Sequence, residues 1–354
     1  MPLIVEGGRV PPRWTLEGNY RPLVSANTRR PGHLNIALIN NMPDAALEDT
    51  ELQFVDLLDD ASGDVPIYLK LYSLTGIPRT DRGQRHLNSF YYGLDELWQN
   101  QFDGVIITGT EPRQPNLRDE PYWRVLADLF DWAERNTTSA ILSCLAAHAS
   151  VLHSDGISRY RLPDKQFGVF ESGKACDHAL INRTAERVRF PHSRWNEVRE
   201  DDLASTGYVV LRKSADAGVD MFVKRKKKSL FVYFQGHPEY GAQTLFKEYR
   251  RDIKRFLNRE REAFPSMPLG YFDASAACLL SGFQKSAMAD RREGVMELFP
   301  EDAIIGSLQN GWHSTAACMY RNWLQYVASR KTETSPFMAS VGRIRSTLAN
   351  GEMA

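Results

Sequence analysis

The stretch Ser139-Ala140-Ile141-Leu142-Ser143-Cys144-Leu145-Ala146-Ala147 decides the fold of this chain. Its apolar run over 139–143 predicts a buried strand, and the small residues after Cys144 predict a helix over 145–152. Cys144 therefore lies where a strand turns sharply into a helix. That position exposes its sulfur near the N–H groups of the helix N-terminus, which favour a thiolate. On its own, a cysteine among alanines more often fills a core, so this interpretation needs a second signal.

Strands alternate with helices on the N-terminal side of this stretch. Apolar runs at 34–39, 66–72 and 102–107 predict strands, and helical spacing is found over 52–58 and 122–136. The alternation predicts an α/β fold of the flavodoxin-like type, with a mostly parallel sheet and helices on both faces. In such sheets, ligands and catalytic groups collect at the carboxyl ends of the strands.

The C-terminal side is less regular. Segments 208–212, 221–223 and 230–234 predict further strands, which can be antiparallel, and the basic run 224–228 predicts a hairpin turn rather than a phosphate contact. Residues 260–310 are only weakly periodic, which predicts irregular structure.

Composition divides the chain into three expected parts. Residues 1–33 are rich in Pro, Arg and Gly and predict an N-terminal arm. We expect one α/β domain over 34–330 and a C-terminal tail over 331–354.

Charge and cysteine usage exclude several classes of function. The 354 residues include 44 basic and 44 acidic ones, so the formal net charge is zero and no nucleic-acid partner is predicted. Four cysteines without CxxC spacing predict neither a metal site nor disulfides. No window approaches about 18 apolar residues and no leader pattern is present, so we expect no membrane association and a cytoplasmic protein.

The second signal for catalysis is the segment Gln235–Tyr240, which follows the predicted strand 230–234. If this segment is extended, His237 and Glu239 project to the same side, and the carboxylate can orient the imidazole. Together with Cys144, they form the nucleophile, base and orienting group of covalent catalysis. His148 is one helical turn beyond the cysteine, where it stacks along the helix, so His237 is the preferred base.

Three further segments carry polar side chains without a decisive pattern. Residues 191–194 (Pro-His-Ser-Arg) can hold a small polar substrate or form a surface turn, and 164–166 is similarly ambiguous. In Arg250-Arg251-Asp252, an arginine can bind a carboxylate, although a solvated helix face is the simpler interpretation.

At this point the chain resembles the homoserine O-succinyltransferase family, the acyltransferases of methionine biosynthesis with a class I glutamine-amidotransferase-like fold. The resemblance covers roughly residues 30–328 and rests on motifs in one order. These motifs are Met42-Pro43, Phe102–Gly104 through Thr108-Gly109, Tyr122-Trp123, Cys144, Gly168–Glu171, Pro191–Arg194, Gly236–Tyr240 continuing through Ala242–Leu245 to Arg251-Asp252, and Trp312-His313 with Asn322–Leu324.

The resemblance implies a ping-pong reaction and a homodimer. An acyl-CoA co-substrate, with no permanently bound cofactor, would acylate Cys144, and His237 would then activate the homoserine hydroxyl. The residues that fall on substrate-contacting positions are Lys165, Ser193 and Arg251. The N–H of Leu145 would face an oxyanion, and Thr110 or Glu111 would supply a second N–H.

The chain departs from the family pattern at two places. Asp44-Ala45 stand where a lysine pair usually follows Met-Pro, and Arg113 falls on the position that influences acyl choice. A guanidinium there would favour a succinyl over an acetyl group if it points inward. Homoserine O-acetyl transfer, serine O-acylation, glutamine amidotransferase-like hydrolysis and a protein without enzymatic activity remain as alternatives.

Overall fold

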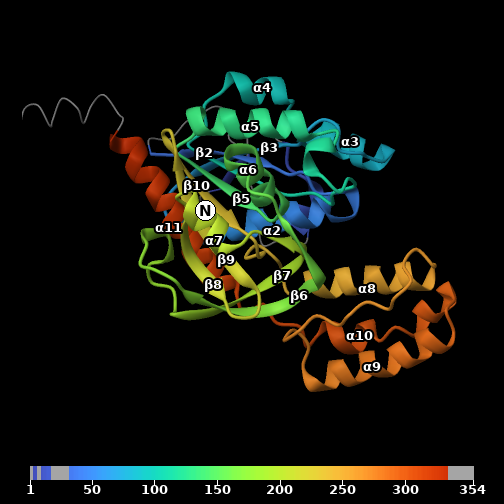
Figure 1. Ribbon diagram of the computed structural model, residues 1–354. Coiled ribbons are helices and arrows are strands. Elements are labelled where there is room, and N and C mark those ends of the chain that lie inside the picture. The colour runs from blue at the N-terminus through green and yellow to red at the C-terminus, as the bar shows by residue number, and fades with distance from the viewer. Residues whose placement is uncertain (1–2, 6–8, 17–31, 334–354) are drawn as a thin grey trace, which may run out of the picture.

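A ten-stranded sheet organises the molecule, in the order β1-β3-β2-β4-β5-β10-β9-β8-β6-β7 (Figure 1). The computed structural model describes residues 3–5, 9–16 and 32–333. The strands are β1 (Leu3–Val5), β2 (Leu34–Ile39), β3 (Ile67–Tyr72), β4 (Gly104–Ile107), β5 (Ser139–Ser143), β6 (Tyr160–Lys174), β7 (Arg187–Glu197), β8 (Val209–Ser214), β9 (Gly218–Lys226) and β10 (Ser229–Phe234).

Pairing divides the sheet into two halves. From β1 to β10 all neighbours are parallel, and from β10 through β9, β8 and β6 to β7 all neighbours are antiparallel. The expected α/β class is confirmed, and so are the antiparallel strands of the C-terminal side. The basic run 224–228 lies at the predicted hairpin turn, where Lys226 pairs with Ser229.

Eleven α-helices are found among the described residues, and some of them cover both faces of the parallel half. The helices are α1 (Pro12–Leu16), α2 (Asp44–Ser62), α3 (Asp81–Phe90), α4 (Leu94–Gln99), α5 (Trp123–Asn136), α6 (Leu145–Asp155), α7 (Glu200–Ser205), α8 (Thr244–Leu257), α9 (Ala274–Ala289), α10 (Glu301–Ile305) and α11 (His313–Glu333). In Figure 1, α4, α5 and α6 lie on one side of the sheet, and α2 and α11 lie together on the other.

The alternation of β2 explains this layering. Ile36 and Leu38 belong to the core that includes α2 and α11, whereas Ala37 and Ile39 belong to the core that includes α5 and α6. Successive strand residues point to opposite faces, so a strand that is apolar throughout must be covered on both sides.

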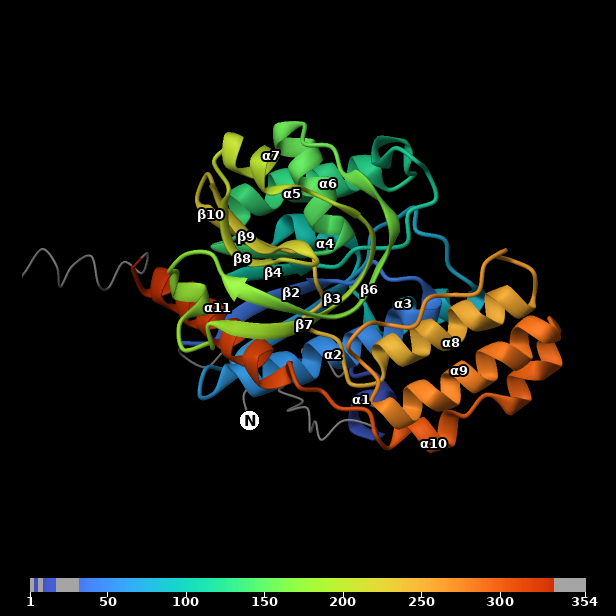
Figure 2. The ribbon, with the colours of Figure 1, turned by 60° about the horizontal axis from the view of Figure 1, so that its bottom comes forward.

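The prediction of irregular structure over 260–310 is wrong. Helix α9, the 3₁₀ segment η4 (Glu293–Leu298) and α10 lie here, and with α8 they form a lobe beside the sheet (Figure 2). The inner face of α9 buries Ala276, Leu280, Phe283 and Ala287, which follow helical spacing. Its outer face is also apolar in part, and this weakened the pattern.

The described parts of the predicted N-terminal arm pack on the domain. β1 extends the sheet as an edge strand beside β3, and Trp14 of α1 is fully buried. At the other end, α11 continues past residue 330, so the predicted tail begins inside a helix. None of the helices described is long and apolar enough to span a bilayer.

Candidate active site

Cys144 connects β5 to α6 without any intervening loop. Its backbone has φ 52° and ψ −109°, a conformation that costs free energy in any residue with a Cβ. The N–H of Cys144 donates to the carbonyl of Phe234 at the end of β10 (2.8 Å), which fixes the turn. The sulfur is thereby held at the carboxyl edge of the parallel strands, partly exposed and beside the N-terminus of α6.

His237 and Glu239 form a buried hydrogen-bonded pair at the same edge. Nδ1 of the imidazole lies 2.9 Å from Oε1 of the carboxylate, and the two residues are 6% and 8% exposed. The segment is not extended as expected, because the N–H of Tyr240 closes a turn on the carbonyl of His237 (3.2 Å). The turn brings the carboxylate within hydrogen-bond distance of Nδ1 of the imidazole.

Ser143 links this pair to the strand that carries the cysteine. Its hydroxyl donates to the same Oε1 of Glu239 (3.0 Å), so the end of β5 positions both Cys144 and the carboxylate. Sequence reasoning missed this role, because a serine at a strand end has no pattern of its own. Its place directly before Cys144 was the available signal.

The surroundings of His237 favour its protonated form. Burial lowers the pKa of His237, but the charges of Glu239 and Cys144 and hydrogen bonds to both raise it to about 10. The imidazole therefore carries a proton at neutral pH.

His148 is placed where it cannot act as the base. Its Nε2 lies 2.8 Å from Oε1 of Gln235, a side chain that also bonds to the backbone of Val198 and Val219. Burial lowers the pKa of His148 to about 3, so the ring is neutral. This geometry agrees with the preference for His237.

The loop after β4 lies directly against the start of α6. A Cβ on Gly109 would lie 2.9 Å from the N atom of Leu145, so only glycine permits this approach. The loop is fixed by Asn41, whose backbone N–H donates to the Thr108 hydroxyl (2.8 Å) and whose side chain donates to the Thr108 carbonyl (3.1 Å). The N–H of Leu145 and the predicted Thr110 thus belong to neighbouring backbones.

The predicted substrate residues Lys165 and Ser193 converge on one carboxylate, Glu248 of α8. The ammonium lies 3.2 Å from Oε2, and the serine hydroxyl donates to the same atom. Tyr240 donates to Oε1 (2.8 Å), and its ring stacks on His237 at 4.2 Å, which joins this cluster to the base. Burial raises the pKa of Glu248, but Lys165, Ser193, Arg251 and Tyr240 together hold it below its ordinary value.

Glu248 was not predicted from the sequence. It precedes Arg251 by one helical turn, so the two share a face of α8. Arg251 hydrogen-bonds to Asp252 (3.2 Å) and lies 3.9 Å from Glu248. Residues 191–194 belong to β7, so a surface turn is excluded there. The Arg251 side chain is 40% exposed and also lies beside Glu248.

Arg113 lies in the same loop as Gly109, further along the chain. Its backbone N–H donates to the carboxylate of Glu120 (2.5 Å), and its side chain is exposed. Arg113 is thus close to Thr110 in the chain. Among the described residues, its recorded hydrogen bond is made by the backbone and not by the guanidinium.

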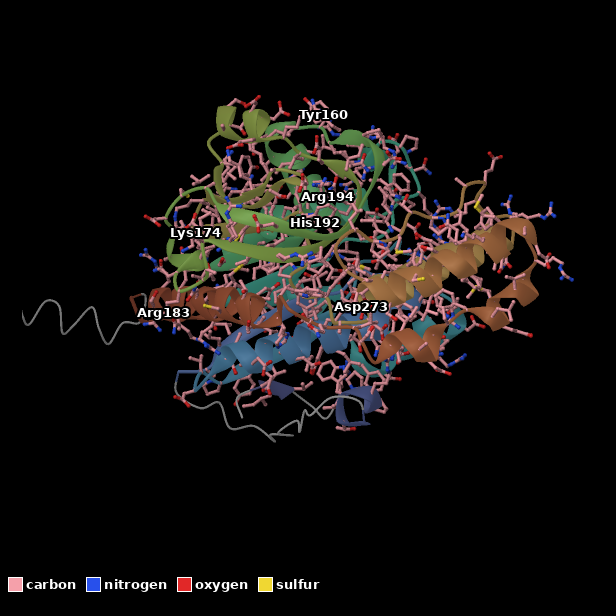
Figure 3. The ribbon with its side chains drawn as sticks, turned by 90° about the horizontal axis from the view of Figure 1, so that it is seen from below. Tyr160, Lys174, Arg183, His192, Arg194 and Asp273 are labelled. Atoms are coloured by element: carbon pink, nitrogen blue, oxygen red, sulfur yellow. The ribbon has the colours of Figure 1, made fainter. Side chains whose placement is uncertain are left out.

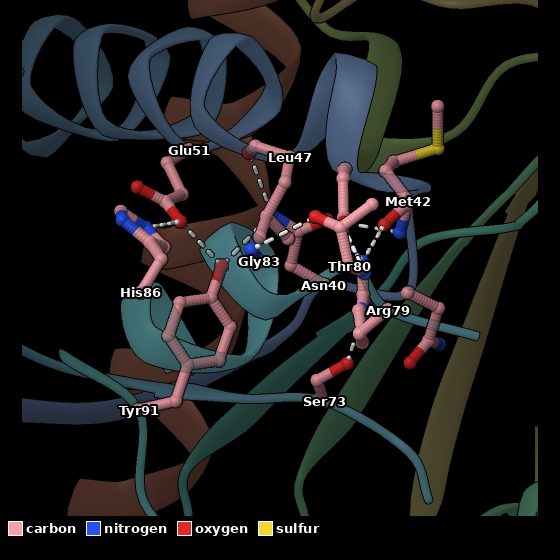
Figure 4. Close-up of polar contacts among 12 residues, drawn as sticks. Asn40, Met42, Leu47, Glu51, Ser73, Arg79, Thr80, Gly83, His86 and Tyr91 are labelled. Atoms are coloured by element: carbon pink, nitrogen blue, oxygen red, sulfur yellow. Dashed lines mark hydrogen bonds and ion pairs between the residues drawn. The ribbon is translucent and has the colours of Figure 1, made fainter. Parts of the chain in front are cut away.

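Asp44, which stands at the position of the family's lysine, faces a buried cation. Arg79 donates to the carbonyl of Met42 (2.6 Å) and to Asp44 (3.1 Å), and Thr80 donates to Asp44 through its N–H (2.7 Å) and its hydroxyl (2.6 Å). Figure 4 shows Arg79 reaching Met42 and Ser73 at this turn. In this chain an acid follows Met42-Pro43, and Arg79 from the loop after β3 lies against it.

A second buried polar cluster lies beside this turn. Oε1 of the fully buried Glu51 accepts from Tyr91 (2.6 Å) and lies 2.7 Å from Nε2 of His86, as Figure 4 shows. Asn40 joins the cluster through the Tyr91 hydroxyl (3.0 Å). These contacts fasten α2 and α3 to the end of β2.

The sheet and these contacts define an α/β protein with a cysteine, a histidine and a carboxylate at the carboxyl edge of its strands. The family model for homoserine O-succinyltransferase matches residues 23–334. The chain belongs to the homoserine O-succinyltransferase family.

Named relatives agree with the family model over most of the chain. A homoserine O-succinyltransferase of Rhodopseudomonas palustris is 44% identical over 296 residues, which is 84% of this chain and 89% of the relative. One of Bradyrhizobium japonicum is 43% identical over 301 residues, 85% of this chain and 92% of the relative. Among solved structures, a glutamine amido transferase from Methylobacillus flagellatus has a TM-score of 0.46 at 15% identity, covering 83% of this chain and 95% of that one.

Proposed function

We propose that this protein transfers an acyl group, preferably succinyl, from acyl-CoA to the hydroxyl of homoserine, as a step of methionine biosynthesis. Family membership supports the substrates. The observation that supports the mechanism is the pairing of His237 with both Glu239 and Cys144, which raises the pKa of the histidine to about 10.

In the first half-reaction, the Cys144 thiolate attacks the thioester carbonyl of acyl-CoA. The N–H of Leu145, with that of Thr110 as the second donor, stabilises the oxyanion. The carbon–sulfur bond to coenzyme A then breaks, and the leaving thiolate takes the proton from His237. The acyl group remains on Cys144 as a thioester.

In the second half-reaction, His237 acts as a base. Acylation removes the charge of Cys144, one of the influences that raise the pKa of His237, so the neutral imidazole can accept the hydroxyl proton. The alkoxide oxygen attacks the thioester, O-acylhomoserine leaves, and the thiolate–imidazolium pair is restored. Glu239 holds Nδ1 throughout and leaves Nε2 free for both transfers.

The cluster around Glu248 is suited to an amino acid. Lys165 and Arg251 provide positive charge for its carboxylate, and Glu248 provides a carboxylate for its ammonium group. Ser193 and Tyr240 orient Glu248 through its two oxygens. Arg113 would pair with the distal carboxylate of a succinyl group from the loop that also carries Thr110.

Intact-mass spectrometry without an acceptor tests the mechanism. We expect succinyl-CoA to add one succinyl group to the wild-type protein and none to Cys144→Ala, and we expect homoserine to discharge the adduct while serine does not. Acetyl-CoA in the same experiment tests the acyl preference. If neither donor forms an adduct, the proposed donors are rejected; hydrolysis of glutamine by the same sample would instead support an amidohydrolase.

We also propose that the protein is a homodimer, as the resemblance implies. The lobe of α9, η4 and α10 supports this, because Leu279, Met288 and Leu298 are 42%, 61% and 69% exposed there. Light scattering after gel filtration should give twice the chain mass for the wild type and a lower mass for Met288→Asp/Leu298→Asp. A monomeric wild type would contradict the proposal.

A further inference from the structure

Two arginine–aromatic stacks lie on the outer ends of β6 and β7. The guanidinium of Arg161 lies 4.4 Å above the Trp195 ring, and that of Arg199 lies 3.9 Å above the Tyr160 ring. Both rings are 38% exposed, although large aromatic side chains are usually covered. We call Tyr160, Arg161, Trp195 and Arg199 the arginine–aromatic platform.

Register places the two stacks side by side. Tyr160 pairs with Glu197 and Arg161 with Asn196 across the antiparallel ladder. Tyr160 lies opposite Glu197, and Glu197 is two residues from Trp195 on β7, so the Tyr160 and Trp195 rings leave the same face of the ladder. Figure 3 shows Tyr160 at one end of this region, with Arg194 and His192 following toward the body of the molecule.

The platform is continuous with the proposed active site. Ser193 and Trp195 are two residues apart on β7, so their side chains leave the same face of the strand. Ser193 contacts Glu248 in the substrate cluster. Arg194 between them points inward, is 4% exposed, and donates to the carbonyls of Asn196 (2.8 Å) and Ala217.

Arg159 extends the positive charge of the platform toward Cys144. Burial lowers the pKa of Arg159, whereas the nearby Tyr122, Cys144 and Glu120 raise it. Segments 159–161 and 195–199 carry three arginines and one acid, Glu197, which pairs with Arg199 at 3.1 Å. In a chain of zero net charge, this is a local excess of positive charge.

We propose that the arginine–aromatic platform binds the nucleotide half of acyl-CoA. This inference rests on the proposed function. Adenine would stack on the exposed rings and guanidinium planes, and the phosphates would be held by the N–H edges of Arg159 and Arg161, because arginine binds phosphate in a two-pronged geometry. From Ser193 to Glu197 is four residues of strand, about 13 Å, a span that the flexible thiol-bearing arm of CoA bridges.

Titration calorimetry with free coenzyme A and with pantetheine, which lacks the nucleotide, tests this site directly. We expect the wild type to bind coenzyme A more tightly than pantetheine. Arg161→Ala/Trp195→Ala should weaken coenzyme A at least tenfold and leave pantetheine unchanged. Arg187→Ala is the matched control, because Arg187 is a 74% exposed arginine at the other end of β7 and should change neither affinity.

Kinetics with two donors give the second readout. With succinyl-CoA, the double variant should raise KM about tenfold and keep kcat, whereas succinyl-pantetheine should be used equally well by variant and wild type. Equal losses with both donors, or no loss with either, would overturn the proposal. So would an altered oligomeric mass with unchanged affinity for coenzyme A, since the platform would then be a subunit contact.

Failure of the proposed function is separable from failure of this site. A wild type that binds coenzyme A through the platform but is never acylated on Cys144 would reject the transferase and retain the nucleotide site. A wild type that is acylated but binds coenzyme A no more tightly than pantetheine would reject the nucleotide site alone.

Discussion

Glu239 raises the pKa of His237, the proposed base, through a contact of 2.9 Å. Folding raises the pKa of His237 from 6.5 to about 10, so the charged imidazole stabilises the native state fully below about pH 6.5. That contribution is lost as the pH rises toward 10. Replacing the carboxylate removes a large part of it.

We therefore expect Glu239→Gln to lower the free energy of unfolding by about 3 kcal/mol at pH 6. The difference from the wild type should narrow as the pH rises to about 10. Urea unfolding at several pH values measures this. Glu171→Gln, which breaks an exposed pair with Arg187, should change stability little at any pH. A loss of stability in Glu239→Gln that does not depend on pH would contradict the role given to the His237–Glu239 pair.

Gly109 controls the position of the predicted oxyanion donor. A methyl group there would lie 2.8 Å from the Leu145 Cβ, so Gly109→Ala must displace the start of α6. We expect acylation of Cys144 to slow about 100-fold. Rapid-quench mass spectrometry measures the rate, with Gly306→Ala as the control, since an added Cβ there meets nothing within 4 Å. An unchanged acylation rate would remove Leu145 from the proposed role.

Residues whose signal is local could be predicted from the sequence, and those that act across the fold could not. Cys144 was identified by the strand-to-helix junction around it, and His237 with Glu239 by their spacing after a strand. Ser143 and Glu248 act on side chains about 100 and 55–83 positions away in the chain. Only the sheet order brings those partners together, and no short pattern encodes it.

At the scale of elements, the contact between β6 and the segment around Leu269 requires a glycine at position 168. Gly168 has φ 149°, and a Cβ there would overlap the backbone of Leu269. That backbone runs beside β6, where Val169 donates to the Leu269 carbonyl (2.8 Å) and Leu269 donates to the Phe167 carbonyl (3.0 Å). The segment leading to the α9 lobe is fastened to the sheet by this contact.

We expect Gly168→Ala to destabilise the protein by roughly 2 kcal/mol or more, because both the conformation and the contact are lost. Gly173→Ala on the same strand is the matched control, since its nearest neighbour lies 4.0 Å from the added Cβ. Thermal unfolding compares the two. Equal melting temperatures would show that the lobe can shift to accept a side chain.

Strands β2, β3, β4 and β5 followed from apolar runs because each run is covered on both faces, whereas β1, α3 and α4 were not predicted. The α9 lobe did not follow from its pattern, since Leu279 and Met288 on its outer face reduce the contrast between the two sides of the helix. The turn at His237–Tyr240 was also missed, because its hydrogen bond to the His237 carbonyl depends on tertiary packing.

At the scale of the whole molecule, the C-terminal segment reaches back to the active site. The indole N–H of Trp312 donates to the Tyr240 carbonyl (2.7 Å), and that of Trp323 donates to the Ser139 hydroxyl (2.9 Å). Residues before and within α11 thus hold the loop of the proposed base and the strand that leads to the proposed nucleophile, so the candidate site is complete only when the end of the domain has folded.

Trp312→Phe keeps the ring and removes its donor. We expect a loss of about 1–2 kcal/mol in the free energy of unfolding and a fall in kcat of several-fold, because the Tyr240 ring supports His237. Trp132→Phe is the control, since the indole nitrogen of Trp132 is buried without a partner among the described residues. A kcat equal to that of the control would separate Trp312 from catalysis.

The backbone conformation at Cys144 lowers the stability of the fold while it exposes the cysteine sulfur. Its positive φ is one that glycine adopts freely, so Cys144→Gly should unfold about 1 kcal/mol less readily than the wild type, while Cys144→Ala, which keeps a Cβ, should show no such gain. Paired denaturation curves measure the difference. A larger free energy of unfolding for the inactive Cys144→Gly variant would show that the strained backbone at Cys144, the proposed nucleophile, lowers the stability of the wild type.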